Sequence, residues 1–199
     1  MLGVMRSLDW FASQVDDSHP RVQRVAEDIA AEWDDWPSPN TYQIGEVFEY
    51  VYENVTYTPD PGGEPYVADP EELLETERGD CDCQAVLIAS LYRAMEVPAR
   101  LTYCRNRDGE EHMFTEVWCG RLSQWEETAE TLTDWYHSEV ERFVWVTQIL
   151  RRGTEIAWVP ADTTTGQHLG DPGGLISAGF IDETPTGFEF YDAYSVRTS

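Results

Sequence analysis

Apolar residues recur every three or four positions through the first half of the chain, which is the spacing of one helix face. This pattern predicts amphipathic helices over 2–15 and 20–35. A third helix is predicted from the capping residue Thr41 to about Asn54. Asp69, followed by Pro70 and two glutamates, is typical of a helix start and predicts a short helix ending near Thr76.

The stretch from Gly79 to Arg100 predicts a buried helix that carries a cysteine in its first turn. Asp80 suits the N-cap, and nothing breaks the helix before Pro98. The unpaired N–H groups of a helix start favour an anion, so Cys81 is placed to act as a thiolate nucleophile. A small, buried and inert thiol is the alternative interpretation. The expected apolar face consists of Ala85, Ile88, Ala89, Tyr92 and Met95.

Beyond Arg100 the hydrophobic period shortens to two, which indicates β-strands. Strands are predicted over 100–105 and 112–119, joined by a hairpin turn at Asp108-Gly109. A pairing of Arg105 with His112 would place Cys104 opposite Met113 in this hairpin. Helical spacing returns within 120–156 and predicts one long helix or two short ones, and a strand is predicted near 188–196.

The net charge of −25 on 199 residues changes the expected environment of the protein. All 13 basic residues are arginine, and an acidic surface without lysine suits concentrated salt. We therefore expect a halophilic source, an archaeon or its virus, with an ordinary acidic protein as the alternative. The same charge argues against nucleic-acid backbones and anionic membranes as partners.

The four cysteines, at positions 81, 83, 104 and 119, are not spaced like a secreted disulfide framework or a zinc ribbon. No apolar run approaches the 18 residues or so that a membrane span requires, and no signal-peptide pattern is seen. We therefore expect a reduced protein of the cytoplasm, or of a virion, with no metal and no cofactor.

Three segments together resemble the transglutaminase-like superfamily. Gly79-x-Cys81 at a helix start, followed by Val97-Pro98-Ala99-Arg100, is similar to the nucleophile segment of that family. The strand from His112 to Cys119 resembles the strand with the family's catalytic histidine. The phrase from Trp158 to Thr164 resembles the strand that carries the third member of the triad. The resemblance covers about 20–119 and 157–165, and Cys83 stands where many relatives carry an acidic residue.

The resemblance implies an α+β, papain-like fold, with a helical first half and the nucleophile helix packed on an antiparallel sheet. It implies a triad in which Cys81 attacks a carbonyl carbon, His112 acts as base and then acid, and Asp162 orients the imidazole. The backbone N–H of Cys81 would be one oxyanion donor, and Tyr57 is a guess for the second. Structural roles for His112, in a strand, and Asp162, in a turn, are the alternatives.

The expected organisation is an N-terminal helix in 1–19, a catalytic core over 20–165 with a helical insertion at 120–156, and an extension over 166–199. The expected activity is hydrolysis of an amide or peptide bond of a protein or peptide substrate, through a thioacyl intermediate. The alternatives are acyl transfer to an amine, which cross-links proteins, and a virion or tail component that retains the triad residues. The helices in 2–15 and 120–156 would offer apolar faces to protein partners, in a homo-oligomer or a virion.

Overall fold

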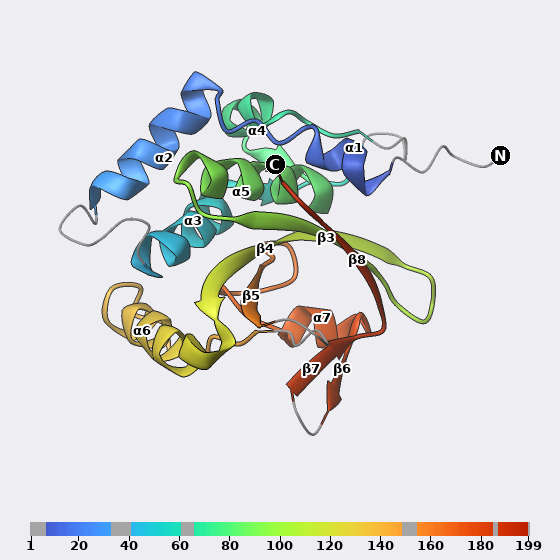
Figure 1. Ribbon diagram of the computed structural model, residues 1–199. Helices are drawn as coiled ribbons and strands as arrows, with labels where there is room; N and C mark the ends of the chain where they lie inside the picture. The colour runs from blue at the N-terminus through green and yellow to red at the C-terminus, as the bar shows by residue number, and fades with distance from the viewer. Residues whose placement is uncertain (1–6, 33–40, 61–65, 149–154, 185–186, 199) are drawn as a thin grey trace.

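The computed structural model describes residues 7–32, 41–60, 66–148, 155–184 and 187–198. A four-stranded antiparallel sheet carries helices on one side, as Figure 1 shows. Its strands follow the order β5-β4-β3-β8, and they are β3 (Ala99–Arg105), β4 (Glu111–Arg121), β5 (Ile156–Ala161) and β8 (Asp192–Arg197). The helices of the first half are α1 (Leu8–Ala12), α2 (Pro20–Glu32), α3 (Thr41–Asn54), α4 (Pro70–Thr76) and α5 (Cys81–Ala94). The predicted α+β architecture, with the nucleophile helix packed on the sheet, is confirmed.

Capping residues fix the starts of α4 and α5 where the sequence predicts them. The Asp69 carboxylate accepts the N–H of Glu72 at 2.9 Å, and Pro70 occupies the first helical turn. The Asp80 carboxylate accepts the N–H of Cys83 at 3.3 Å. These caps satisfy N–H groups that would otherwise lack partners, so α5 begins at Cys81.

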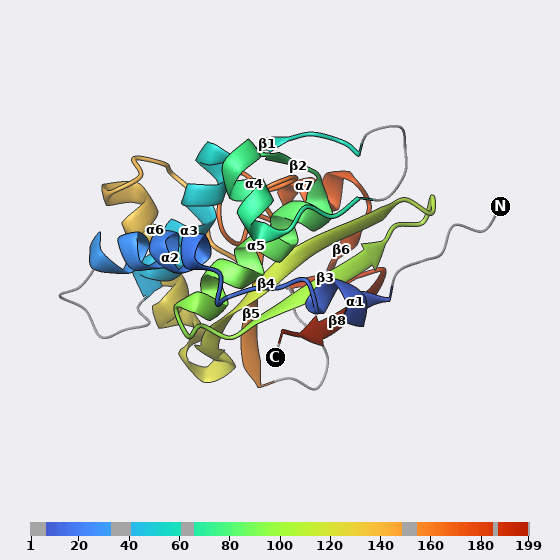
Figure 2. The same cartoon turned by 90° about the horizontal axis from the view of Figure 1, so that it is seen from above.

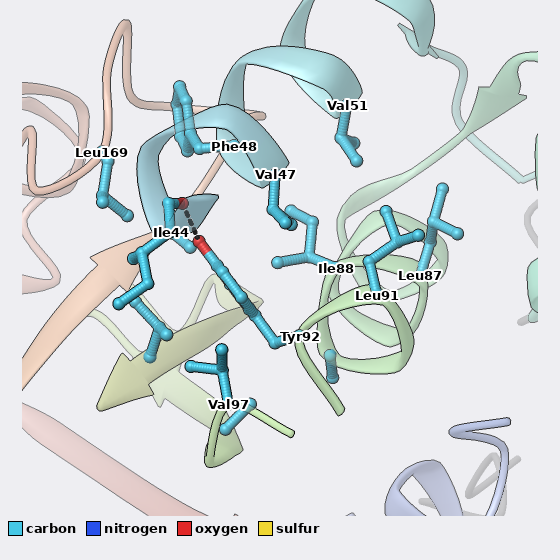
Figure 3. Close-up of a cluster of buried hydrophobic side chains, with 14 of the residues drawn as sticks. Ile44, Val47, Phe48, Val51, Leu87, Ile88, Leu91, Tyr92, Val97 and Leu169 are labelled. Carbon is cyan, nitrogen blue, oxygen red and sulfur yellow. Dashed lines mark hydrogen bonds between the residues drawn. The ribbon is translucent and has the colours of Figure 1, made fainter. Parts of the chain in front are cut away.

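Helix α5 is the centre of the molecule, and Figure 2 shows it between the other helices and the sheet. Every residue from Cys83 to Tyr92 is buried, so the helix is enclosed on all sides rather than on one face. Figure 3 shows the layer that it shares with α3, where the Tyr92 hydroxyl donates to the Ile44 carbonyl at 2.9 Å. This bond satisfies the one polar group that Tyr92 brings into the core.

A short parallel pair of strands leads the chain into α5. Strand β1 (Thr56–Tyr57) lies beside β2 (Arg78–Gly79), and Tyr57 is the partner of Gly79. The N–H of Thr58 donates to the Gly79 carbonyl at 3.0 Å. A Cβ atom at Gly79 would lie 2.7 Å from both the Cys83 and the Leu73 side chains, so this position has room only for glycine. The backbone that leads into Cys81 is therefore held by strand β1 and by the packing of Cys83 and Leu73 against Gly79.

The C-terminal segment forms α7 (Gly173–Ser177), the hairpin of β6 (Ile181–Thr184) and β7 (Gly187–Phe190), and then β8. Strand β8 pairs with β3 along its length, from Arg105↔Asp192 to Arg100↔Arg197. The single strand predicted near 188–196 is thus two strands that belong to different sheets. A second, smaller hydrophobic cluster lies between this segment and the main sheet, and it comprises Cys104, Phe114, Leu175, Phe180 and Ile181.

The helical prediction for the insertion is correct only in part. After η2 (Leu122–Gln124), helix α6 runs over Trp125–Ser138 and packs on α3 and β4. Residues 140–148 are not helical, and within them Val144 and Val146 are buried while Phe143 is 88% exposed. This alternation is the pattern of an extended segment. Glu141, at a φ of 55°, marks the break, and residues 149–154 of the predicted helical region lie outside the described residues.

Two further predictions are corrected or limited. The helix predicted over 2–15 is described only as α1, because residues 1–6 lie outside the described ranges. The hairpin register differs by one position, since Cys104 pairs with His112 and Arg105 with Glu111. The cause is Asn106, whose Oδ1 accepts the N–H groups of Asp108 and Glu110 and so sets the loop length. No helix in the described residues is long and apolar enough to cross a membrane.

Candidate active site

The structure brings Cys81, His112 and Asp162 together. His112 Nε2 lies 2.7 Å from Asp162 Oδ2, and both side chains are buried. The Cys81 side chain is also within hydrogen-bonding reach of the His112 imidazole. Since Asp162 occupies Nε2, the nitrogen left for the thiol is Nδ1. A thiol, an imidazole and a carboxylate are thus aligned in the order that a cysteine triad requires.

Three different elements position these side chains. Cys81 is the first residue of α5 and is half-buried. Strands β4 and β5 are antiparallel partners, with Thr115 opposite Ala161, so the start of β4 and the end of β5 lie at one end of the sheet. The Thr115 hydroxyl donates to the Ala85 carbonyl at 2.7 Å and thereby joins β4 to α5. The strand register therefore carries His112 and Asp162 to the start of the helix.

Asp162 is held by its own loop. Its Oδ1 accepts the N–H and the hydroxyl of Thr164, at 3.1 and 2.8 Å, and the N–H of Thr165 at 3.2 Å. The Thr165 hydroxyl donates to Oδ2 at 2.6 Å. An aspartate followed by three threonines is a sequence signal for such a loop, because short hydroxyl side chains and nearby N–H groups readily bond a carboxylate. The roles of Thr164 and Thr165 were not predicted from the sequence.

The electrostatics favour an ion pair between His112 and Asp162. Burial alone would raise the pKa of Asp162, but the charge of His112 and the surrounding hydrogen bonds lower it to about 2. Burial alone would lower the pKa of His112, but Asp162, and to a lesser degree Cys81, raise it to about 10. The imidazole is therefore protonated, and the carboxylate ionised, at neutral pH.

Two aromatic rings cover His112. The ring centroid of Phe114 lies 5.8 Å from that of His112, and the centroid of Phe180 lies 5.4 Å away. Phe180 is buried and comes from the C-terminal segment, between α7 and β6. The contact of Phe180 with His112 was not predicted, because nothing in the local sequence indicates that this phenylalanine faces a histidine 68 positions earlier in the chain.

Tyr57 lies at the site and remains exposed, with 55% of its surface accessible. It is the strand partner of Gly79, two residues before Cys81. Partial burial, and then the neighbouring charges of Cys81 and Asp80, raise the pKa of the Tyr57 hydroxyl. The hydroxyl is thus protonated at neutral pH and able to donate a hydrogen bond. Its role as an oxyanion donor stays a prediction, as does that of the Cys81 backbone N–H.

The other cysteines have different surroundings. Cys83 is buried, its sulfur accepts the N–H of Ala68 at 3.3 Å, and burial raises its pKa. Cys119 belongs to the main core, whereas Cys104 belongs to the second cluster. Within the described ranges, the side chains close enough to share a metal ion are those of Asp80, Asp82 and Cys83, and they do not form a four-thiol site.

Comparison with known proteins identifies the family of the chain. A family model described as "Transglutaminase-like superfamily" matches residues 27–163, which is more than half of the chain. The chain belongs to the transglutaminase-like superfamily. A search of curated proteins found no match.

Several solved structures are similar to this member of the superfamily at low identity. A protein of Cytophaga hutchinsonii, titled as a candidate cysteine protease, is 14% identical with a TM-score of 0.44, over 98% of this chain and 56% of that one. Calcium-bound LapG of Legionella pneumophila is 14% identical with a TM-score of 0.46, over 86% of each chain. A candidate protease of Parabacteroides distasonis is 14% identical with a TM-score of 0.43, over 56% of this chain and 23% of that one. The chain thus spans about half the length of the Cytophaga protein, and less of the Parabacteroides protein.

The pKa directions predict how the pair contributes to stability. Asp162 titrates below its ordinary value of 3.8, so its contribution is present above that pH and is lost as the pH falls towards 2. His112 titrates above its ordinary value of 6.5, so its contribution is complete below that pH and is lost as the pH rises through about 10. His112→Gln should therefore lower the free energy of unfolding most between these two ordinary values, by about 3–5 kcal/mol. Urea unfolding across the pH range measures this difference, and one that does not vary with pH would contradict it.

Proposed function

We propose that the protein is a cysteine hydrolase that cleaves an amide or peptide bond through a thioacyl intermediate. The observation that supports this most directly is the buried contact of His112 with Asp162 beside the half-buried Cys81. A structural histidine needs no thiol beside it, and a structural cysteine needs no ionised imidazole. All three groups of a nucleophilic triad are present: Cys81 begins α5, His112 lies on β4, and Asp162 is held in the loop that follows β5.

The proposed reaction has two stages. The Cys81 thiolate forms a bond to the carbonyl carbon, and the imidazolium of His112 gives its proton to the leaving amine as the C–N bond breaks. Water then attacks the thioester while His112 takes its proton, and the thiolate leaves with the electron pair of the C–S bond. Asp162 keeps the imidazole oriented and supports its positive charge throughout. Tyr57 and the Cys81 N–H are our candidates for oxyanion donors.

A primary amine in place of water would make the same site an acyl transferase, since the thioester forms identically. The two outcomes are separated by incubating the protein with a peptide library, with and without a primary amine. Mass spectrometry would show free acids for hydrolysis and amine adducts for transfer. We favour hydrolysis because every step needs only water and the residues described.

Selective alkylation tests the proposed nucleophile. A short iodoacetamide pulse at neutral pH should label Cys81 at least about tenfold faster than Cys83, Cys104 and Cys119, because only Cys81 combines a helix start, partial exposure and a histidine partner. Peptide mass spectrometry of the folded protein measures the four rates.

Exposure alone could also favour Cys81, so a second comparison is required. His112→Ala should slow the labelling of Cys81, since the imidazolium that stabilises the thiolate is lost. His168→Ala is the matched control, because His168 is half-buried against Tyr136 and is not part of the site. Equal rates for all four cysteines, or equal effects of the two histidine changes, would refute the proposed nucleophile.

The charge of the chain suggests where this chemistry takes place. We infer that the protein works in concentrated salt, in a halophilic archaeon or its virus. The net charge of −25 on 199 residues means that its many carboxylates repel one another in dilute buffer. Raising KCl from about 0.1 M to about 1 M shortens the Debye length from about 10 Å to about 3 Å. The urea midpoint should therefore rise over this range. It should rise less when the exposed Glu27, Glu75 and Glu130 are changed to glutamine, and a midpoint that is flat or falls would contradict the inference.

A further inference from the structure

The side chain of Gln84 joins the nucleophile side of the candidate site to the acid side. Gln84 is only 2% exposed, on the first turn of α5. Its Nε2 donates to the Gly79 carbonyl at 3.1 Å, and its Oε1 accepts the Thr163 hydroxyl at 2.6 Å. Gly79 lies two residues before Cys81, and Thr163 directly follows Asp162. One buried amide thus bonds both the segment that presents the thiol and the loop that presents the carboxylate.

The two ends of this link differ in how firmly they are held by other contacts. The Gly79 carbonyl also accepts the N–H of Thr58, and no side chain would fit at Gly79 against Cys83 and Leu73. This end is a fixed point of the fold. The loop at the other end bonds the Asp162 carboxylate through Thr164 and Thr165, which orients the carboxylate within its loop. Those internal bonds do not set the distance of the loop from α5, whereas the bond from Thr163 to Gln84 does.

We propose that Gln84 and Thr163 form a positioning brace that sets the spacing between Cys81 and the His112–Asp162 pair; this inference rests on the proposed function. The contact from Thr115 to Ala85 fixes His112 relative to the same helix. The bond between Thr163 and Gln84 fixes Asp162 relative to α5 in the same way. The positions of all three triad residues are therefore set by the first turns of α5. A displacement of about 1 Å in such a constellation can cost about 10²-fold in rate.

Thr163→Val tests the brace with little change of shape, at a half-buried position that should not prevent folding. It removes the hydroxyl and leaves Gln84 Oε1 without that donor. We expect alkylation of Cys81 to slow by about tenfold, and Thr163→Ser, which keeps the hydroxyl, to restore the rate. Gln84→Met, which removes both bonds, should slow it at least as much.

Ser90→Ala is the matched control for a purely structural loss. Ser90 is fully buried on the same helix, and its hydroxyl donates to the Val86 carbonyl at 2.8 Å, away from the triad. It should lower the urea midpoint without slowing the labelling of Cys81. If Ser90→Ala and Thr163→Val slow labelling equally, the effect is general loosening and the brace is refuted.

A readout that does not depend on the thiol completes the test. The titration of His112, followed by NMR of the imidazole nitrogens, should move to lower pH in Thr163→Val, because Asp162 no longer sits at its bonding distance; Ser90→Ala should leave it unchanged. If the wild-type protein shows no preferential labelling of Cys81, the proposed function fails, and the His112 titration alone then decides on the brace. An unchanged titration in Thr163→Val overturns it.

Discussion

Replacing Asp162 with asparagine should reduce amide hydrolysis by about 10³–10⁴-fold, and the alkylation of Cys81 by at least about tenfold. The larger figure is the loss seen when the acid of a comparable triad becomes an amide. The substitution keeps the size of the side chain and the oxygen that accepts from Thr164 and Thr165. The expected loss therefore reports the chemistry of the pair rather than a cavity.

The reason lies in the tautomer of His112. The carboxylate accepts a hydrogen bond from Nε2–H at 2.7 Å, which leaves Nδ1 to exchange a proton with the thiol. An amide nitrogen in that place would donate to Nε2 instead, and the proton of a neutral imidazole would then sit on Nδ1, facing the thiol. His112 could no longer accept the proton of Cys81. The pKa of His112 should also fall from about 10, because Asp162 is the main influence that raises it.

Asp171→Asn is the control for this prediction. Asp171 lies in the same connection after β5, and its carboxylate accepts the N–H groups of Gln167 and Gly173 at 2.9 and 2.8 Å. It makes loop contacts of a similar kind without touching His112. Asp171→Asn should leave hydrolysis and labelling within about twofold of the wild type, in line with the small effect of most substitutions that break no special feature. Equal losses in the two variants would show that the loop, and not the charge of Asp162, matters.

The assignment of Cys81, His112 and Asp162 to one site came from the resemblance of three sequence segments to the superfamily, and each residue lies where one element gives way to another. Capping residues, hydrophobic periodicity and hairpin signals are local, and they predicted the start of α5 and the return strand β4, whereas the end of β5 was predicted from the resemblance. The bond between Gln84 and Thr163 could not be found in this way, since it spans 79 positions and no local signal pairs the two residues. The same holds for Phe180, whose contact with His112 depends on how the C-terminal segment folds back.

Two errors show where local reasoning fails. The register of the hairpin was wrong by one position because a side chain, Asn106, and not the Asp108-Gly109 pair alone, determines the loop. Within 120–156 one long helix or two short ones were predicted, but α6 ends at Ser138, although apolar residues continue beyond it at helical spacing. Arg142 explains the break in part, since it donates to Glu49 at 2.9 Å and to the Gln167 carbonyl at 2.6 Å. These distant partners hold the chain in an extended course that periodicity does not reveal.

Helix α7 bears directly on the acid loop, which leads to the second large effect. A Cβ atom at Gly174 would lie 2.1 Å from the Thr165 carbonyl oxygen and 2.5 Å from the Thr165 Cβ. Backbone atoms cannot turn aside as the end of a long side chain can, so either α7 or the loop must shift. Thr165 donates both its N–H and its hydroxyl to Asp162. A shift of the loop would therefore displace the carboxylate from His112.

Gly174→Ala should lower the free energy of unfolding by about 1–3 kcal/mol, the usual cost of overpacking, and should slow the labelling of Cys81 by about tenfold. Gly173→Ala is a close control, because it makes the same substitution one residue earlier in the same helix. The three nearest atoms to a Cβ there all belong to the Asp171 side chain, the closest at 3.0 Å, so a shift of a few tenths of an ångström in that side chain relieves the contact. Its stability should stay within about 0.5 kcal/mol of the wild type, with labelling unchanged.

Urea unfolding and the iodoacetamide pulse, applied to both glycine variants, distinguish a shift of the loop that holds Asp162 from a shift of α7. If Gly174→Ala loses stability and reactivity together, the loop has moved, and the C-terminal segment helps to hold Asp162 in place. This outcome would mean that residues beyond the 27–163 match to the superfamily support the site, as the contact of Phe180 with His112 also suggests. If it loses stability while Cys81 reacts as before, α7 has moved instead, and the acid loop depends on Gln84 and its own threonines rather than on the segment that follows.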